Sequence, residues 1–171
     1  MRNYILAFLL CGIFFLFPFQ VYVIGNGIGI GIEGAVYRLQ ITSYGNAFLP
    51  ITSDILYILR GIYSGKTALS ILVWVLGTVL LTATTIFGLI FAGDSRTDYS
   101  RQITFGLIGT CICYLISCIA QYGFFFNGPA GISIPIGIFL MLFWVILLNI
   151  YPDFFSDLNT FFSSEPDEGK S

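Results

Sequence analysis

The stretch from Gln102 to Pro152, QITFGLIGTCICYLISCIAQYGFFFNGPAGISIPIGIFLMLFWVILLNIYP, contains no charged residue. A helix needs roughly 20 apolar residues to cross a bilayer core about 30 Å thick. This stretch is about twice that long, and its main turn signal, Asn127-Gly128-Pro129, falls near its middle. It therefore predicts two membrane-crossing helices joined by a tight turn.

The composition of the whole chain indicates the same class of protein. Of its 171 residues, 57% are hydrophobic and only 9% are charged, whereas about 25% are charged in a soluble domain. The length fits a single domain. The seven Lys and Arg residues are scattered, so they form no basic stripe for nucleic acid. The chain has no His, which removes the commonest metal ligand and general base. We expect an integral membrane protein without a cofactor, a metal or a catalytic site.

Four charge-free segments are long enough to be membrane spans. They cover residues 4–23, 68–92, 103–125 and 130–150. The first is interpreted as an uncleaved helix, because its apolar run is longer than the roughly 7–15 residues of a signal-peptide core. The sequence thus predicts an all-α integral membrane fold, a four-helix transmembrane bundle. A small β-hairpin and a short interfacial helix are expected in the first loop, residues 24–66.

The expected hairpin rests on a period of two in that loop. Ile28, Ile30 and Ile32 alternate with glycines, and Tyr37 to Thr42 alternates apolar and polar side chains. Such alternation is typical of half-buried strands, and the turn falls at Glu33-Gly34. The glycines indicate close backbone packing. Because an isolated hairpin is marginal in water, we expect it to pack on the helices or on a third strand at residues 47–51.

Two further helices are expected outside the spans. Ser53 is a favourable N-cap and Asp54 a favourable first-turn residue, and apolar residues follow at helical spacing up to Ile62. The tail, residues 152–163, also has the pattern of an amphipathic helix, with acidic residues on its polar side. It is expected to rest on the bilayer or to dock a partner, and residues 164–171 to be disordered. The apolar side of the tail consists of Phe154, Phe155, Leu158, Phe161 and Phe162.

The basic residues favour one orientation in the cell membrane. Four spans place both termini on one side, together with Arg96 and Arg101 in the short loop between spans two and three. Loops rich in Lys and Arg tend to be cytoplasmic. We therefore expect both termini to be cytoplasmic and the loop of residues 24–66 to lie outside.

Small and polar residues form a stripe along each of the two central spans. Their spacing of three or four residues places the members of each stripe on one helix face. Small residues and hydroxyls let membrane helices pack closely, so helix packing is the first interpretation, and the lining of a pore or substrate path is the alternative. The stripes are Gly106, Thr110, Cys113, Ser117 and Gln121 in one span and Thr78, Thr82 and Thr85 in the other.

The predicted spans contain no ionisable carboxylate, Lys or Arg. Pumps and ion-coupled transporters depend on such intramembrane groups, so active transport is disfavoured. The cysteines, Cys11, Cys111, Cys113 and Cys118, lie in apolar runs without a Cys-x-x-Cys spacing, and are interpreted as small buried side chains.

The strands expected between Ile28 and Ile41, the helix from Asp54 to Tyr63 and the four spans resemble the claudin-type tetraspan architecture. The loop lacks the Trp and the paired Cys typical of that family. The resemblance implies lateral self-association and contacts through the outer loop. We expect a non-enzymatic protein that acts through protein–protein interaction, as an accessory subunit of a membrane complex or as an adhesion or scaffold protein. An oligomeric channel or passive pore is the alternative. Besides the tail, the candidate partner-docking residues are Tyr37, Leu39 and Ile41.

Overall fold

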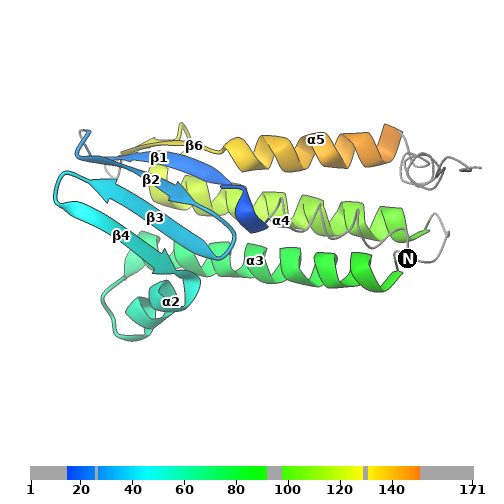
Figure 1. The fold of residues 1–171 in the computed structure, drawn as a ribbon, viewed down its shortest axis with the longest axis horizontal. Coiled ribbons are helices and arrows are strands. Elements are labelled where there is room, and N and C mark those ends of the chain that lie inside the picture. The colour runs from blue at the N-terminus through cyan, green and yellow to red at the C-terminus, as the bar shows by residue number, and fades with distance from the viewer. Residues whose placement is uncertain (1–14, 26, 92–97, 129–130, 151–171) are drawn as a thin grey trace, which may run out of the picture.

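The computed structural model describes residues 15–25, 27–91, 98–128 and 131–150 (Figure 1). Three helices lie side by side, and a β-sheet covers one end of this helical layer. The sheet has six antiparallel strands in the order β4-β3-β2-β1-β6-β5. The strands are β1 (Gln20–Ile24), β2 (Gly29–Glu33), β3 (Tyr37–Thr42), β4 (Gly45–Pro50), β5 (Asn127–Gly128) and β6 (Gly131–Ile134).

The sheet joins two parts of the chain that are far apart in sequence. Strands β1 to β4 follow one another as a meander, and β6 then pairs with β1 on the other side, with Val21 opposite Ile134. Gly131 makes this junction possible. Its φ of 129° disfavours other residues, and a Cβ there would lie 1.8 Å from the carbonyl oxygen of Val23.

The helices differ in length. Helix α3 (Gly65–Phe91) and helix α4 (Asp98–Tyr122) pack along each other, and α5 (Ile136–Ile150) packs on α4. The short α2 (Ile51–Leu59) follows β4 directly. It begins two residues before the predicted Ser53 cap, because Pro50 ends β4 in an extended conformation from which the helix starts.

The predicted all-α four-helix transmembrane bundle is wrong. Within the described residues only two helices, Gly65–Ile90 and Arg101–Tyr122, are long and apolar enough to cross a membrane. The predicted first span, residues 4–23, runs into strand β1, and its residues 4–14 lie outside the described part. The predicted fourth span, residues 130–150, is divided between β6 and the shorter helix α5.

The error has a physical cause. Gln20–Ile24 and Gly131–Ile134 are short apolar runs rich in Val and Ile, and a run of this length reads equally as a strand or as part of a buried helix. The predicted pairing of β2 with β3 is correct, with Ile30 opposite Ile41. These two strands are not an isolated hairpin, however, because β4 and β1 extend the sheet on either side.

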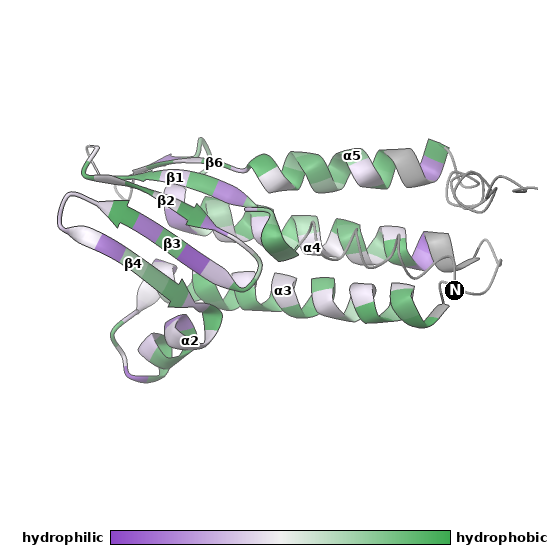
Figure 2. Ribbon diagram, in the orientation of Figure 1, coloured by the Kyte–Doolittle hydropathy of each residue, from purple (hydrophilic) through white to green (hydrophobic). Residues whose placement is uncertain are grey.

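Aromatic side chains fill the junction between the sheet and the helices. Phe19 stacks on Tyr114 of α4 with ring centroids 4.4 Å apart, and Trp74 of α3 is fully buried beside them. Beyond this junction the three helices are apolar along most of their length (Figure 2). The exposed large side chains there include Leu72, Leu76, Val79, Ile86, Phe105, Ile112, Ile116, Phe139, Phe143 and Ile146.

Candidate functional site

The side of the sheet that packs on the helices is polar. Because neighbouring residues of a strand point to opposite faces, the buried side chains of the strands define one face, which we call the inward face. Ordinary sheets place apolar residues on the packed face and polar residues in water. On this sheet, by contrast, most of the inward residues are polar or Gly. The inward face comprises Gln20, Tyr22, Gly29, Gly31, Glu33, Arg38, Gln40, Thr42 and Ser133, together with the apolar Ile24, Ala47 and Leu49.

Three charged side chains meet beneath the sheet and form what we call the charge cluster. Arg38 donates through one terminal nitrogen to Glu33 Oε1 at 2.8 Å, and its other terminal nitrogen lies 3.6 Å from Asp54 Oδ1. All three residues are at most 4% exposed. The guanidinium also lies 5.4 Å from the ring centroid of Trp74, within the range of a cation–π interaction.

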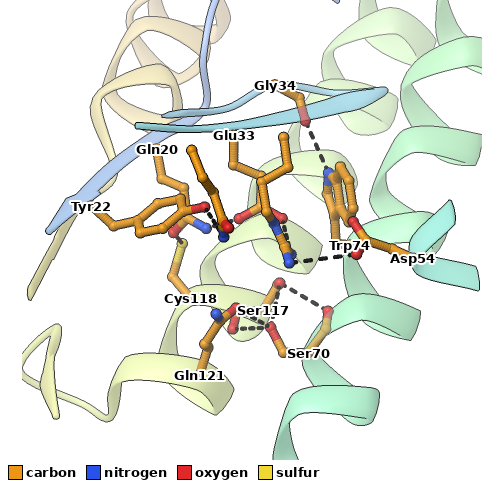
Figure 3. Close-up of polar contacts among 12 residues, drawn as sticks. Gln20, Tyr22, Glu33, Gly34, Asp54, Ser70, Trp74, Ser117, Cys118 and Gln121 are labelled. Carbon is orange, nitrogen blue, oxygen red and sulfur yellow. Dashed lines mark hydrogen bonds and ion pairs between the residues drawn. The ribbon is translucent and has the colours of Figure 1, made fainter. Parts of the chain in front are cut away.

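Local structure explains why these three charges meet. Glu33 and Arg38 are directly opposite each other in the β2–β3 pair, so their side chains leave the sheet side by side. Asp54 comes from the first turn of α2, and the hydrogen bond from Ile51 N to Val36 O fixes the start of that helix against the β2–β3 turn. Figure 3 shows Asp54 beside Trp74 of α3, on the opposite side of Glu33 from Gln20 and Tyr22.

The charge cluster shifts the pKa values of its members and neighbours. Burial alone would lower the pKa of Arg38, but the two carboxylates outweigh burial and hold it above its ordinary value. For Asp54 burial is the larger effect, so its pKa is raised despite the attraction of Arg38. Burial raises the pKa of Tyr22 to about 12. Tyr22 is therefore a neutral phenol at physiological pH, and its oxygen accepts a hydrogen bond from Gln40 Nε2 at 3.0 Å.

The charge cluster is not fully satisfied by hydrogen bonds. Among the described residues, three buried atoms of the charge cluster have no hydrogen-bond partner. They are the two carboxylate oxygens of Asp54 and the Nε of Arg38. One cation for two carboxylates leaves the cluster with a formal charge of −1 when both are ionised. Buried ion pairs contribute little to stability on balance, whereas removal of one partner leaves the other charge buried and uncompensated.

A second group of polar contacts ties the sheet to the helices. Trp74 donates from Nε1 to the carbonyl of Gly34 at 3.1 Å, and Thr78 donates to that of Ala35 at 2.6 Å. From α4, Cys118 donates to Gln20 Oε1, which also accepts from Ser133. The Nε2 of Gln20 in turn donates to Glu33. The β2–β3 turn is thus bonded to α3, and strand β1 is bonded to α4.

Residues of the predicted α4 stripe lie where α4 meets α3, whereas in the predicted α3 stripe Thr78 is the member that contacts α4, through the hydroxyl of Tyr114. A Cβ on Gly106 would come within 2.1 Å of the hydroxyl of Thr84, so the glycine allows close approach. Ser117 and Ser70 bond to each other, and Ser70 also donates to Gln121 (Figure 3). The remaining residues include hydroxyls that bond within their own helix. Thr110 donates to Gly106 O and Thr82 to Thr78 O, Cys113 lies against Gly77, and Thr85 is half-buried.

The opposite side of the sheet, which we call the outward face, is apolar and exposed. The registers of the strand pairs place most of its side chains in two rows that cross the sheet, and Tyr37 lies beyond these rows, opposite Pro50. Predicted docking residues Tyr37, Leu39 and Ile41 lie on this face, whereas those of the tail fall outside the described residues. The rows are Asn46, Ile41, Ile30, Val23, Ile132 and Asn127, and Phe48, Leu39, Ile32, Val21 and Ile134.

The sequence predicted neither the charge cluster nor which face of the sheet packs on the helices. Alternation shows which residues share a face, but not which face is covered. A signal was present in Gln20, a lone amide at the end of a long apolar run, because buried amides need partners.

Comparisons with protein-family models, with curated proteins and with solved structures find no match.

Proposed function

We propose that this chain is a membrane-anchored, non-enzymatic protein that acts by binding another protein through the outward face of its sheet. The reversed polarity of the sheet carries this proposal. Side chains such as Ile30, Phe48 and Ile134 are 55%, 64% and 56% exposed, and they belong to the two rows that cross the sheet from strand to strand. Contiguous apolar patches on a protein surface mark interaction sites, whereas an uncovered patch of this kind is an aggregation hazard.

The membrane part of the proposal rests on α3 and α4. Both are long and apolar enough to cross a bilayer, both are apolar along most of their length (Figure 2), and many of their large apolar side chains are exposed. Helix α5 carries the same kind of exterior. We place α2 and most of the sheet outside the cell membrane, and the connection between α3 and α4 in the cytoplasm. The β2–β3 turn, which bonds to Trp74 and Thr78, reaches the membrane part of α3. The basic residues Arg96 and Arg101 in or beside that connection favour this orientation.

An accessory subunit or an adhesion or scaffold protein fits this arrangement better than an enzyme. The only carboxylates of the inward face and α2 that approach each other, Glu33 and Asp54, are turned to Arg38 and sealed from solvent. A likeness to the claudin-type architecture enters the proposal only through the strands and the short helix that precede α3. It transfers no functional residue, because fold likeness does not give function.

A photo-crosslinking experiment tests the proposal. A benzophenone amino acid replaces Ile41 on the outward face, and in a matched variant it replaces Leu59, which is 77% exposed at the end of α2. Membranes are washed with alkaline carbonate before irradiation. We expect the chain to stay with the membrane and to give a discrete protein adduct from position 41 but not from position 59. Release by carbonate, or lipid adducts alone from position 41, would show that the proposal is wrong.

A further inference from the structure

We propose that the occupant of the outward face is a second copy of this chain. The two sheets pack face to face about a two-fold axis parallel to the long helices, within one membrane. This inference rests on the proposed function, because it names the partner of the same face. The chemistry, the size and the direction of the face each support it.

The chemistry of the face favours a partner with an uncharged surface. No side chain of the two rows is charged, so the face offers no charge pattern by which a different, charged partner would be selected. A second copy meets it without like-charge repulsion. One row is nearly symmetric, with Asn46 and Asn127 at its two ends and Ile or Val between them. An apolar centre with a polar rim is the usual anatomy of a protein interface.

The size of the face is sufficient for a dimer held in a membrane. Strands lie about 4.8 Å apart and residues of one face about 7 Å apart along a strand. Six strands and two rows therefore give a flat footprint of about 400 Å² per copy. The projecting side chains bring the total accessible area of two copies near the roughly 1,000 Å² that a specific interface needs. Anchoring in one bilayer also reduces the rotational freedom lost on association.

The direction of the face suits two upright copies. In Figure 1 the strands run obliquely along the length of the helices, and the sheet lies flat against one end of α3 and α4. Its outward face is therefore turned sideways, away from the helices. A half-turn about an axis parallel to α3 brings two such faces together and leaves the helices of both copies pointing the same way. Sheets that pack face to face lie about 10 Å apart.

Charge exchange at the centre of the face tests the inference. Two copies with different affinity tags are produced together and purified in mild detergent through one tag. We expect wild-type copies to purify together and Ile30→Asp to lower this recovery at least ten-fold. Ile30→Asp combined with Ile30→Lys should restore it, because opposite charges then meet. Leu59→Asp, an exposed position off the face, should behave as wild type.

Each outcome decides the matter. Restoration by the opposite charge shows that both variants fold and that position 30 lies in the contact. The inference is overturned if wild-type copies do not purify together, or if Leu59→Asp and Ile30→Asp act alike. It is also overturned if the adduct formed from position 41 joins this chain to a different protein. In that case the proposed function stands and only the identity of the partner changes, whereas lipid adducts alone would remove both.

Discussion

The inward and outward faces of the sheet come from the same strands and differ in polarity and in burial. On β2, Glu33 is buried against Arg38, while Ile30, three residues earlier, is more than half exposed. In a water-soluble protein the apolar face would be the covered one. The difference teaches that two demands act on one strand. The inward side chains determine how the sheet sits on the helices, and the outward side chains are free to meet another molecule.

If this division is correct, substitutions on the inward face change folding, and substitutions on the outward face change association. The largest effect is expected from Arg38→Met, which keeps the length of the side chain and removes its charge. Glu33 and Asp54 would then be buried without a cation. Removing one partner of a buried ion pair typically costs about 3–5 kcal/mol. The free energy of unfolding, measured in detergent with a chemical denaturant, should fall by about that amount.

The matched control for this prediction is Arg60→Met. Arg60 lies at the end of α2 and is exposed, so loss of its charge should change the free energy of unfolding by only about 0.5 kcal/mol or less. Equal effects of the two substitutions would contradict a structural role for the charge cluster.

Part of the two-faced sheet could be predicted from the sequence. A period of two is a local signal, and it predicted β2 and β3 from Ile28 to Thr42. The strands β1 and β6 could not be predicted in the same way. Gln20–Ile24 and Gly131–Ile134 lie beside longer apolar runs, and only their pairing with each other in three dimensions distinguishes them from helix ends.

The charge cluster was beyond prediction for a related reason. Glu33 and Arg38 are neighbours across one turn, so their pairing follows from the hairpin alone. Their burial does not, because it depends on α3 and α4 covering that side of the sheet. Asp54 was predicted only as a favourable first-turn residue of a helix. Its place beside Arg38 depends on how α2 docks after β4, which no pattern in the sequence describes.

A second, smaller effect is expected from adding a methyl group at Gly31, where it would collide with the ring of Tyr22. Gly31 lies opposite Tyr22 in the β1–β2 pair, and a Cβ on Gly31 would come within 2.1 Å of the buried ring. The ring would have to leave its hydrogen bond with Gln40. Gly31→Ala should therefore lower the free energy of unfolding by about 1–3 kcal/mol, the usual cost of overpacking.

The neighbouring residue on the other face provides the contrast. Ile30→Ala removes an exposed side chain, so it should lower the free energy of unfolding of the separated chain by less than about 1 kcal/mol. It should weaken the recovery of differently tagged copies instead. If Ile30→Ala destabilised the fold more than Gly31→Ala does, the assignment of the two faces would have to be exchanged.

The smallest effect, and one of opposite sign, is expected from Asp54→Asn. The pKa of Asp54 is raised, first by burial and then by Glu33, against the attraction of Arg38. A raised pKa means that the folded chain holds this proton more tightly than the unfolded chain, whose Asp has a pKa of about 3.9. As the pH rises from that value through the raised pKa, the folded state loses stability, and above it the loss is constant.

Asn carries no charge at any pH, and Arg38 keeps its hydrogen bond to Glu33 at 2.8 Å. At pH 7 the variant should therefore be equal to wild type or more stable by about 1 kcal/mol or less. Its advantage should disappear when unfolding is measured below about pH 4. The groups that face Asp54 are Arg38, Glu33 and Tyr63, and Tyr63→Phe provides the control for the last of them. A variant that is less stable than wild type at pH 7 would show that ionised Asp54 is needed as a partner of Arg38, and that the cluster tolerates its negative charge.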